Sequence, residues 1–536
     1  MFRKNCFVKV ICVLVCVLLL TGCLDNSIKT KAVELSPAQV RHAELVEKAN
    51  ETVAKRWEEN KHDPLYPVYH VRSQAHYIND PTGPIFYNGK YHLFFQQEIY
   101  TDMEQEMDAV GRGWGHVASE DLVYWEHWPI AIVPSEPYDA YDKVNDWGGG
   151  CWSGTCVIGP DGFPVIIYSV RPEGGQGIAT SYDGMKTWVK HPDNPVLKHW
   201  EDESSGFRDP FPISKDGDTY SIIIGSQWYD NGIFATATLY ESKDLVNWKF
   251  VNPLLRGHDG IFYECPGMLP FGDKYIFWAS LATSEMSKTK CVVGDYKDKR
   301  FIPEGQWQFL DFGADGTFYA PTAMTDQKGR VIMWGYIGCR GHEPVRIIDG
   351  KEKTFRWSQV QSVPRHLFPR PDGRVGMEPI PELKQLRGKG YRFTDITQNP
   401  DSPNILKDIK GDALEIIAEF ENIDADSYGL DVWRSEDGNK SIPIVYYAEN
   451  ERFGIGAPGV YSSVSGAFSL LEDEKTVRMH IFIDKLVVEA YLNKREYIAY
   501  GSGLRQPEEL GLSIISTGGS VKIKSLEIWE MNSCYK

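Results

Sequence analysis

The sequence lacks the short motifs that mark many metal and cofactor sites. It contains no HExxH pair, no paired CxxC motifs and no glycine-rich phosphate loop. It also lacks an excess of basic residues: 57 Lys and Arg stand against 74 Asp and Glu, for a formal net charge of −17. Because nucleic acids and anionic lipids are polyanions, this charge argues against both as main partners. It does not restrict a neutral ligand.

Cysteine is too scattered to form a disulfide framework. Of the ten cysteines, four lie within the first 23 residues and six are spread from Cys151 to Cys534. Cys151 and Cys156 are the nearest pair in the main part of the chain. A framework needs many cysteines in a short chain, so we predict no disulfide bond.

The apolar run near the N-terminus is too short to span a bilayer. Residues 10–20 follow three basic residues and have the length of a secretory h-region. The run ends in Leu20-Thr21-Gly22-Cys23, which resembles the lipobox of bacterial lipoproteins. The resemblance implies a signal peptide over residues 1–22, a lipid on Cys23 and an exported protein anchored to a membrane outside the cytoplasm. A plain signal peptide with an incidental cysteine is the alternative.

The remaining chain is too long for one compact core, so we expect at least two domains. Residues 23–69 are predicted to form a tether and a spacer helix. That helix is expected from about Ser36 to Asn60, with Ser36 as N-cap and Pro37 at the first helical position.

From residue 70 to residue 370 the sequence has an all-β pattern. Short β-branched and aromatic runs are separated by Gly, Pro, Asp and Asn. The pattern Ser-x-Asp-Leu-Val-x-Trp at 119–125 recurs at 242–248, with a looser copy at 181–188. The four tryptophans of this series, Trp125, Trp188, Trp248 and Trp307, are 63, 60 and 59 residues apart.

A second landmark repeats in step with the tryptophans. A polar or aromatic residue precedes an apolar strand at spacings of 73, 56, 55 and 55 residues; these residues are Asp80, Ser153, Asp209, Glu264 and Tyr319. Five units of nearly 60 residues predict a five-bladed β-propeller. We expect a linker over residues 371–393 and, from the renewed strand alternation, a β-sandwich over residues 394–536 without a catalytic constellation.

Three carboxylates stand at these repeated landmarks. Asp80 lies in Asn79-Asp80-Pro81-Thr82-Gly83, Asp209 follows Arg208, and Glu264 lies in Tyr263-Glu264-Cys265-Pro266. Taken singly, each is most simply a turn or salt-bridge residue. Radial repeats place equivalent positions at equivalent radii, so we expect the three carboxylates to converge in one central funnel.

Three converging carboxylates can cleave a glycosidic bond with retention of configuration. One carboxylate must attack the anomeric carbon, and a second, protonated carboxyl group must supply a proton to the leaving group. We expect Asp80 to be the ionised nucleophile. We expect apolar sequence neighbours to raise the pKa of Glu264, and Arg208 to keep Asp209 ionised.

The chain resembles glycoside hydrolase family 32, the β-fructofuranosidases of invertase, levanase and inulinase type. The motifs that carry the resemblance run in order from about residue 72 to residue 530. They are Asn79 to Gly83, Phe94-Phe95-Gln96, Trp114-Gly115-His116, Trp152-Ser153-Gly154, Phe207 to Pro210, Tyr263 to Pro266, Asp311-Phe312-Gly313, Phe318-Tyr319-Ala320, Trp357, Val363-Pro364-Arg365 and His480 to Tyr491.

The resemblance implies a retaining hydrolase that releases β-linked fructose from sucrose or fructans, without a metal or organic cofactor. It makes Asp80 the nucleophile, Glu264 the acid/base and Asp209 the stabiliser of the transition state. The residues expected around the terminal fructose are Asn79, Gln96, Trp114, Trp152, Ser153, Arg208 and Tyr336. Three residues depart from the family pattern: Thr82, Tyr336 and Lys485. We expect the first two to influence the choice of leaving group.

Three other functions fit the same residues. They are an arabinosyl furanosidase, a fructosyltransferase and a fructan-binding lipoprotein without catalysis. The sequence leaves open the linkage preference, exo or endo action and the oligomeric state. The preference is expected to depend on loops around the funnel, at residues 99–110, 134–149 and 338–354.

Overall fold

The computed structural model describes most of the chain from Ile28 to Tyr535. The described ranges are 28–101, 110–140, 149–198, 206–229, 232–257, 260–282, 287–313, 317–339, 345–348, 351–456, 463–502 and 505–535. The expected signal peptide and Cys23, and much of the three expected specificity loops, lie outside these ranges. Within them, no helix combines the length and the apolarity needed to cross a bilayer.

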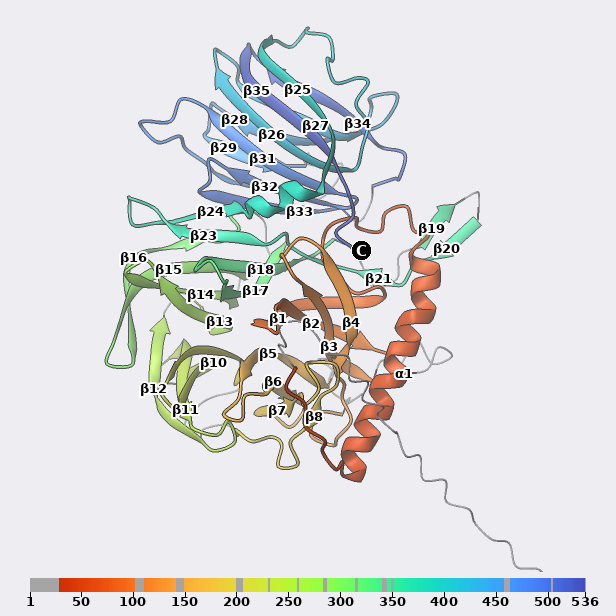
Figure 1. Cartoon of the computed structure of the whole chain (residues 1–536). Helices are drawn as coiled ribbons and strands as arrows, with labels where there is room; N and C mark the ends of the chain where they lie inside the picture. The colour runs from red at the N-terminus through yellow and green to blue at the C-terminus, as the bar shows by residue number, and fades with distance from the viewer. Residues whose placement is uncertain are drawn as a thin grey trace, which may run out of the picture.

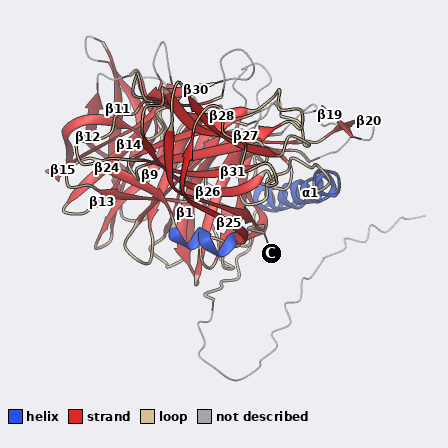
Figure 2. Cartoon of the chain, turned by 90° about the horizontal axis from the view of Figure 1, so that it is seen from above, coloured by secondary structure: helices blue, strands red, loops and turns tan. Residues whose placement is uncertain are grey.

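The one long helix in the described ranges is α1, Pro37–Asn60. It begins with a capping box, in which the Ser36 hydroxyl accepts from the Gln39 N–H and the Gln39 side chain accepts from the Ser36 N–H. Its Ala49 packs in a small apolar cluster with Ile130 and Val133 of the first blade and its edge. The helix therefore lies along the side of the β-structure, as Figures 1 and 2 show.

The strands from β1 to β24 form five antiparallel blades, which confirms the predicted propeller. The strands of the blades, from the innermost outward, are β1 (His76–Tyr87), β2 (Lys90–Ile99), β3 (Gly111–Ser119) and β4 (Trp125–Ile132); β5 (Gly150–Ile158), β6 (Pro164–Arg171), β7 (Gln176–Thr180) and β8 (Val189–Lys190); β9 (Arg208–Asp216), β10 (Thr219–Tyr229), β11 (Ile233–Ser242) and β12 (Trp248–Gly257); β13 (Phe262–Phe271), β14 (Lys274–Ala282), β15 (Ser287–Lys297) and β16 (Arg300–Phe309); and β17 (Phe318–Thr325), β18 (Val331–Ile337), β23 (Arg365–Pro369) and β24 (Val375–Pro379).

The five innermost strands surround a common axis. Each contacts the innermost strand of the next blade, and β1 contacts both β5 and β17. Shorter strands link and extend the blades: β19 (Val345–Ile348) and β20 (Lys351–Thr354) form a hairpin, β21 (Trp357–Ser358) pairs in parallel with β1, and β22 (Val360–Gln361) pairs with β18. Apolar side chains fill the space between neighbouring blades; Phe94 and Tyr168, for example, share a buried cluster between the first two.

The expected linker over residues 371–393 is too long at both ends. Strand β24 completes the fifth blade by pairing with β23, so the propeller extends to Pro379. A short 3₁₀ helix, Pro381–Leu386, follows, and β25 (Arg387–Gln398) already belongs to the second domain. Only a few residues connect the domains, because the other residues of the expected linker belong to paired strands of one domain or the other.

The second domain is a sandwich of two antiparallel sheets packed over a continuous apolar core. In spatial order, one sheet contains β25, β35 (Val521–Met531), β26 (Ala413–Asn422), β31 (Val477–Asp484), β32 (Val487–Leu492) and β33 (Glu496–Gly501); the other contains β30 (Val464–Ala467), β29 (Arg452–Ile455), β28 (Ile442–Tyr447), β27 (Ser427–Arg434) and β34 (Gly511–Thr517). Figure 1 shows it stacked on the side of the propeller where β23 and β24 lie.

A buried polar cluster joins the two domains. His70, just before the first blade, lies between Asp484 and Glu489 of the sandwich, with nitrogen–oxygen distances of 2.9 and 2.8 Å. All three side chains are completely buried. The Asp484 carboxylate also accepts backbone N–H bonds from Val68, Tyr69 and His70. We call these three ionisable side chains the interdomain cluster.

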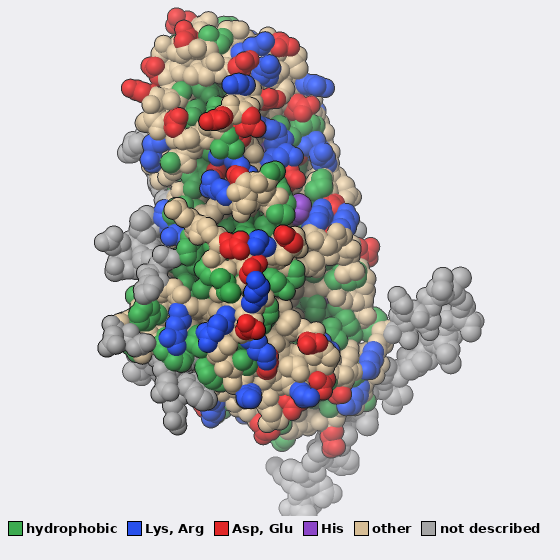
Figure 3. Space-filling model, turned by 90° about the vertical axis from the view of Figure 1, so that its left-hand side faces the viewer, with side chains coloured by type: hydrophobic (Ala, Val, Ile, Leu, Met, Phe, Trp, Pro, Cys, Tyr) green, Lys and Arg blue, Asp and Glu red, His purple; other side chains and the backbone are tan. Residues whose placement is uncertain are grey.

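Charges on the visible outer surface are mixed in sign. On the face shown in Figure 3, acidic and basic side chains alternate over both domains. The net charge of −17 is therefore not concentrated on this face.

Candidate active site

Each innermost strand carries a related tripeptide near its beginning. The five are Asn79-Asp80-Pro81, Trp152-Ser153-Gly154, Arg208-Asp209-Pro210, Glu264-Cys265-Pro266 and Tyr319-Ala320-Pro321. The ladder to the neighbouring strand shifts register at all five. Such β-bulges bend a strand and re-aim its side chains. The sequence thus repeats one local distortion in every blade, on one end of the propeller.

The tripeptides form two levels of side chains. The first residues are half-buried in every blade: Asn79, Trp152, Arg208, Glu264 and Tyr319, which we call the mouth ring. The second residues are buried in every blade: Asp80, Ser153, Asp209, Cys265 and Ala320, which we call the floor ring. The three carboxylates are divided between these levels.

The expectation that Glu264 holds the same blade position as Asp80 and Asp209 is therefore wrong by one residue. The residue that precedes proline in the fourth tripeptide is Cys265. Glu264 belongs to the mouth ring, where its side chain is 24% exposed, whereas Asp80 and Asp209 are 7% and 4% exposed. The convergence holds, but one carboxylate lies at the mouth and two lie on the floor.

Asp80 is held by three neighbours that approach one of its oxygens. Its Oδ2 accepts from the Ser153 hydroxyl at 2.5 Å and the Gln96 amide at 3.3 Å, and the Cys265 thiol lies 3.7 Å away. Burial, and then the negative charge of Glu264, raise the pKa of Asp80 to about 6. Asp80 is still ionised at neutral pH, as expected, although it titrates much closer to neutrality than an exposed aspartate.

Asp209 lies on the floor beside Asp80, in a backbone conformation with φ of 64°. Its N–H donates to the Ser169 hydroxyl at 2.7 Å, and its Oδ2 accepts from the Cys265 N–H at 3.0 Å. The Arg208 Nε lies 3.5 Å from Oδ2. Burial raises the pKa of Asp209 and the Arg208 charge opposes this only in part. The expected influence of Arg208 is present, but burial is the larger effect on the pKa of Asp209 and acts in the opposite direction.

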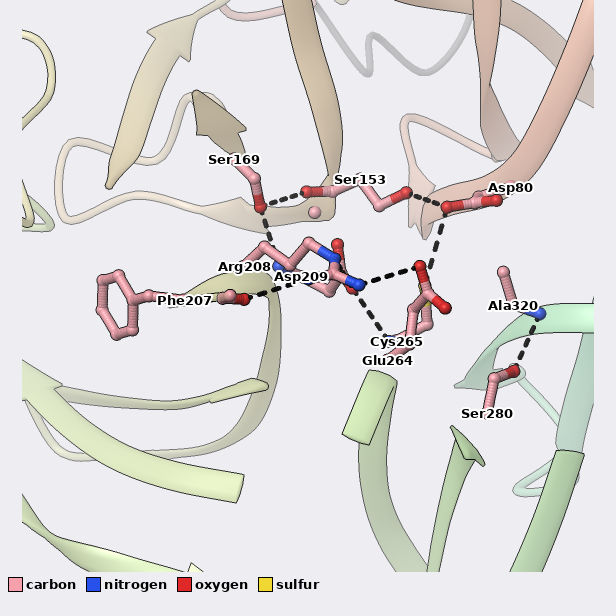
Figure 4. A network of polar contacts seen from close by, with 12 residues as sticks. Asp80, Ser153, Ser169, Phe207, Arg208, Asp209, Glu264, Cys265, Ser280 and Ala320 are labelled. Carbon is pink, nitrogen blue, oxygen red and sulfur yellow. Dashed lines mark hydrogen bonds and ion pairs between the residues drawn. The ribbon is translucent and has the colours of Figure 1, made fainter. Parts of the chain in front are cut away.

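Glu264 meets polar groups rather than the apolar ones expected from its sequence neighbours. Its two oxygens accept from Arg208 Nη2 at 3.1 Å and from the Tyr319 hydroxyl at 2.6 Å. Tyr263, its neighbour in sequence, is fully buried and packs in the propeller core instead. Residues adjacent in a strand point in opposite directions, so the neighbours in sequence do not surround the carboxylate. Figure 4 shows Arg208 between Asp209 and Glu264, and Asp80 opposite them.

A cavity of about 430 Å³ opens above these groups. Its lining consists of all five mouth-ring residues together with Asp80, Gln96, Arg112, Arg171, Gly206, Asp209 and Tyr336. Eight of the ten predicted catalytic and substrate-binding residues thus line one cavity. The fold brings them together from all five blades.

The other two predicted residues, Trp114 and Ser153, do not line the cavity. Trp114 is completely buried, and its indole N–H donates to the Trp152 carbonyl at 3.0 Å, so it supports the cavity wall from behind. Ser153 is also buried and reaches the site through its hydrogen bonds with Asp80 and Gln96. Both contribute to the positions of cavity residues rather than to the cavity surface.

Thr82 likewise acts away from the cavity surface. It is 1% exposed, and its hydroxyl bonds both the carbonyl oxygen and the N–H of Gly154, at 2.5 and 2.9 Å. These bonds join the first blade to the second. Thr82 therefore has a structural role, whereas the second departure, Tyr336, does line the cavity, with its ring 6.1 Å from that of Tyr319.

Four cavity residues were missed by the sequence analysis as site residues: Gly206, which has no side chain, and three residues with side chains. Tyr319 could have been found, because it occupies the repeated landmark in the fifth blade. Arg112 and Arg171 had no such signal, since each ends or begins a strand without a repeated pattern. Their guanidinium carbons lie 5.1 and 5.2 Å from the Trp152 ring, on which both stack.

Comparison with known protein families agrees with this site. Residues 70–379 match the glycosyl hydrolases family 32 N-terminal domain, and residues 382–530 match the family 32 C-terminal domain. The chain belongs to glycosyl hydrolase family 32. The boundary between the two matches falls between β24 and the 3₁₀ helix, where the structure also separates the domains.

Relatives of this family 32 chain include proteins that are named as fructan-degrading enzymes. A levanase of Bacillus subtilis is 28% identical over 504 residues, covering 86% of this chain and 70% of the levanase. A fructan 6-exohydrolase of Beta vulgaris is 30% identical over 364 residues, covering 61% of this chain and 56% of that enzyme. Among solved structures, fructan 1-exohydrolase IIa of Cichorium intybus shares the fold with a TM-score of 0.73 at 22% identity, covering 88% of this chain and 98% of its own.

Proposed function

We propose that this family 32 glycoside hydrolase releases β-linked fructose from sucrose or fructans with retention, through a fructosyl-enzyme intermediate. The observation that carries the proposal is that two carboxyl groups occupy different levels of the same cavity. A buried aspartate lies on the floor, and a more exposed glutamate with two hydrogen-bond donors lies at the mouth. Retaining glycosidases need such a pair of carboxyl groups on either side of the scissile bond.

Asp80 is suited to the role of nucleophile. The hydrogen bonds that described residues donate to its carboxylate all end on Oδ2, so Oδ1 is available to attack the anomeric carbon. The neighbours fix the carboxylate in one orientation before substrate arrives, which lowers the entropic part of the barrier.

Glu264 is suited to the role of acid/base. Its place in the mouth ring brings it to the side from which the leaving group departs. In the first step it gives its proton to the glycosidic oxygen; in the second it takes a proton from the water that attacks the fructosyl–Asp80 ester. Tyr319 and Arg208 hold its two oxygens through both steps.

Asp209 is suited to stabilise the positive charge that develops on the sugar ring. It lies on the floor, fixed by the Cys265 N–H and beside the guanidinium of Arg208. As a carboxylate it can also accept hydrogen bonds from fructosyl hydroxyls. Asn79, Gln96 and Trp152 supply further polar and aromatic surface of the cavity.

Digestion of sucrose, inulin and levan, with identification of the products, tests this function. Release of fructose by the wild type, and none by a folded Asp80→Ala variant, is the expected result. Release of arabinose from arabinosyl substrates would favour a different furanosidase. Fructosyl transfer in place of hydrolysis at high sucrose would favour a transferase. Fructan binding without turnover would overturn catalysis.

We also propose that residues 1–22 are a signal peptide and that a lipid on Cys23 anchors the protein outside the cytoplasm. The basic residues, the apolar run and the Leu-Thr-Gly-Cys sequence support this. Cell fractionation of the full chain and of a Cys23→Ala variant tests it. The wild type is expected in the membrane fraction and the variant in the soluble exported fraction; equal distribution would contradict the anchor.

A further inference from the structure

Three exposed apolar side chains gather at the rim of the propeller. Tyr229, Ile233 and Ile261 are 53%, 45% and 45% exposed. Ten large hydrophobic side chains are exposed in the described part of the chain, and four of these lie in the blades. Three of the four are Tyr229, Ile233 and Ile261, which we call the rim patch. Isolated exposed residues need no explanation, but a gathering of this kind does.

Strand pairing places the three side chains together. Tyr229 and Ile233 are direct partners at the end of the β10–β11 hairpin, where the ladder runs without a bulge. The Ala235 N–H donates to the Gly260 carbonyl at 3.3 Å, which ties this hairpin to the residue just before Ile261. The rim patch therefore bridges the third and fourth blades, which lie side by side in Figure 1.

The rim patch lies at the cavity end of the propeller. On one side, Arg208 pairs with Gly225, four residues before Tyr229 on the same strand, a distance of about 13 Å along an extended chain. On the other side, Ile261 precedes Glu264 by three residues, or about 10 Å. Between them the Phe262 ring lies 3.9 Å from the Arg208 guanidinium. The rim patch is thus next to the mouth ring but outside the cavity.

The hairpin that bears the rim patch is held firmly from its other face. Trp228 stacks on Phe250 with ring centroids 6.5 Å apart, and the Arg256 guanidinium lies 4.2 Å from the Trp228 ring. Side chains of successive strand residues point to opposite faces, so the Tyr229 side chain points to the face opposite Trp228. The stacking of Trp228 therefore holds the strand that carries Tyr229.

We propose that the rim patch binds sugar units of a fructan chain that extend out of the cavity. The proposal rests on the proposed function, because the chain must leave the cavity past the mouth ring. A tyrosine ring and two isoleucines offer apolar surface to the C–H faces of furanose rings. Three side chains are too few for a stable protein interface, which needs about 20–30 residues on each side. The rim patch predicts a preference for fructans over sucrose.

Steady-state kinetics on sucrose and on a long fructan test the proposal. For Tyr229→Ala, and for the double variant Ile233→Ser/Ile261→Ser, we expect the KM for fructan to rise about five- to tenfold, with kcat and all sucrose constants unchanged. Ile302→Ser is the matched control: Ile302 is 49% exposed on β16, the outermost strand of the fourth blade, and its loss is expected to change neither substrate.

Two results would overturn the proposal. One is an unchanged KM for fructan in both rim variants. The other is an equal loss on sucrose, which would show general damage to the cavity. Direct binding separates this proposal from the proposed function. In an Asp80→Ala background, levan affinity is expected to fall about five- to tenfold when Tyr229→Ala is added. No fall would contradict the rim patch, whether or not the wild type hydrolyses fructan.

Discussion

Two of the buried carboxylate clusters in the described part of the chain differ in how their negative charges are compensated. In the interdomain cluster, Asp484 and Glu489 enclose His70 and receive donors from every side, including the Val363 N–H and the Tyr497 hydroxyl on Glu489. On the cavity floor, burial raises the pKa of both Asp80 and Asp209, and the negative charge of Glu264 adds to both shifts. Arg208 is shared between Asp209 and Glu264.

The difference separates what stabilises the fold from what prepares it for chemistry. A buried carboxylate with an imidazolium and several N–H donors is compensated. One that shares its site with other carboxylates is not, and its raised pKa is a cost in stability at neutral pH. The cavity floor therefore places poorly compensated negative charge where the proposed mechanism forms a positively charged sugar ring. The interdomain cluster, in contrast, links the two domains.

Replacement of Asp80, the proposed nucleophile, is expected to have the largest effect. Asp80→Asn removes the attacking oxygen, so kcat should fall about 10⁴-fold or more. The same change removes an uncompensated buried charge, so the free energy of unfolding should rise by about 1–3 kcal/mol. Kinetics and chemical denaturation on the same preparation check both. Lower stability would contradict the comparison of the two sites.

Replacement in the interdomain cluster is expected to lower the stability of the fold and to leave the activity nearly unchanged. Asp484→Asn leaves a buried imidazolium with one partner fewer, which should lower the free energy of unfolding by about 3–5 kcal/mol. The kcat per folded molecule should stay within about twofold of wild type, because Asp484 belongs to the sandwich and lies outside the cavity. A large loss of kcat in fully folded protein would show that the two sites are coupled.

The pH dependence of stability should reveal the titration of His70. Burial is the largest single influence on the pKa of His70 and lowers it. The hydrogen bonds and charges of Asp484 and Glu489 together outweigh burial and raise this pKa to about 9. A base whose pKa is raised on folding stabilises the folded protein. This stabilisation is complete below the pKa of the unfolded state, about 6.5, and is lost as the pH rises through 9. The loss is on the order of 3 kcal/mol. A His70→Gln variant should lack this dependence between pH 7 and 10.

The pH dependence of activity should reveal Asp80. If Asp80 is the nucleophile, its carboxylate must be ionised to attack, so kcat/KM is expected to rise about fivefold from pH 5 to pH 6 and about tenfold from pH 5 to pH 7, where it levels off. A profile already flat at pH 5 would mean that another group compensates the buried charge.

The smallest effect is expected at Thr82. Thr82→Val removes two hydrogen bonds to Gly154 and should lower the free energy of unfolding by about 1–2 kcal/mol. The ratio of kcat/KM for sucrose to that for fructan should not change, because Thr82 does not line the cavity. A changed ratio would restore the expectation that this residue influences the leaving group.

The propeller could be predicted from the sequence because its repeat is regular. Turn residues and tryptophans at intervals near 60 mark each blade, and the same intervals bring Asp80, Asp209 and Glu264 to one funnel. The boundary at β24 could not be predicted. That strand belongs to the fifth blade only because it pairs with β23, and pairing is a tertiary property that its short sequence does not encode.

The details of the site depended on contacts between blades. The one-residue offset of Glu264 is visible in the sequence, where Cys265 and not Glu264 precedes the proline. The environment of Glu264, in contrast, comes from Tyr319 in the next blade and Arg208 in the preceding one. Arg112 and Arg171 enter the cavity by stacking on Trp152. None of these contacts is local in sequence, which explains why the three carboxylates were predictable but their surroundings, including Arg112 and Arg171, were not.

Trapping the intermediate tests the central claim most directly. A Glu264→Gln variant, given a fructoside with a leaving group that needs no proton, should form the fructosyl-enzyme and hydrolyse it slowly, because the general base is missing. Peptide mass spectrometry after acid quenching should find one fructosyl unit on the peptide that contains Asp80. A fructosyl unit on another peptide, or release of fructose with inverted configuration, would contradict Asp80 as the nucleophile.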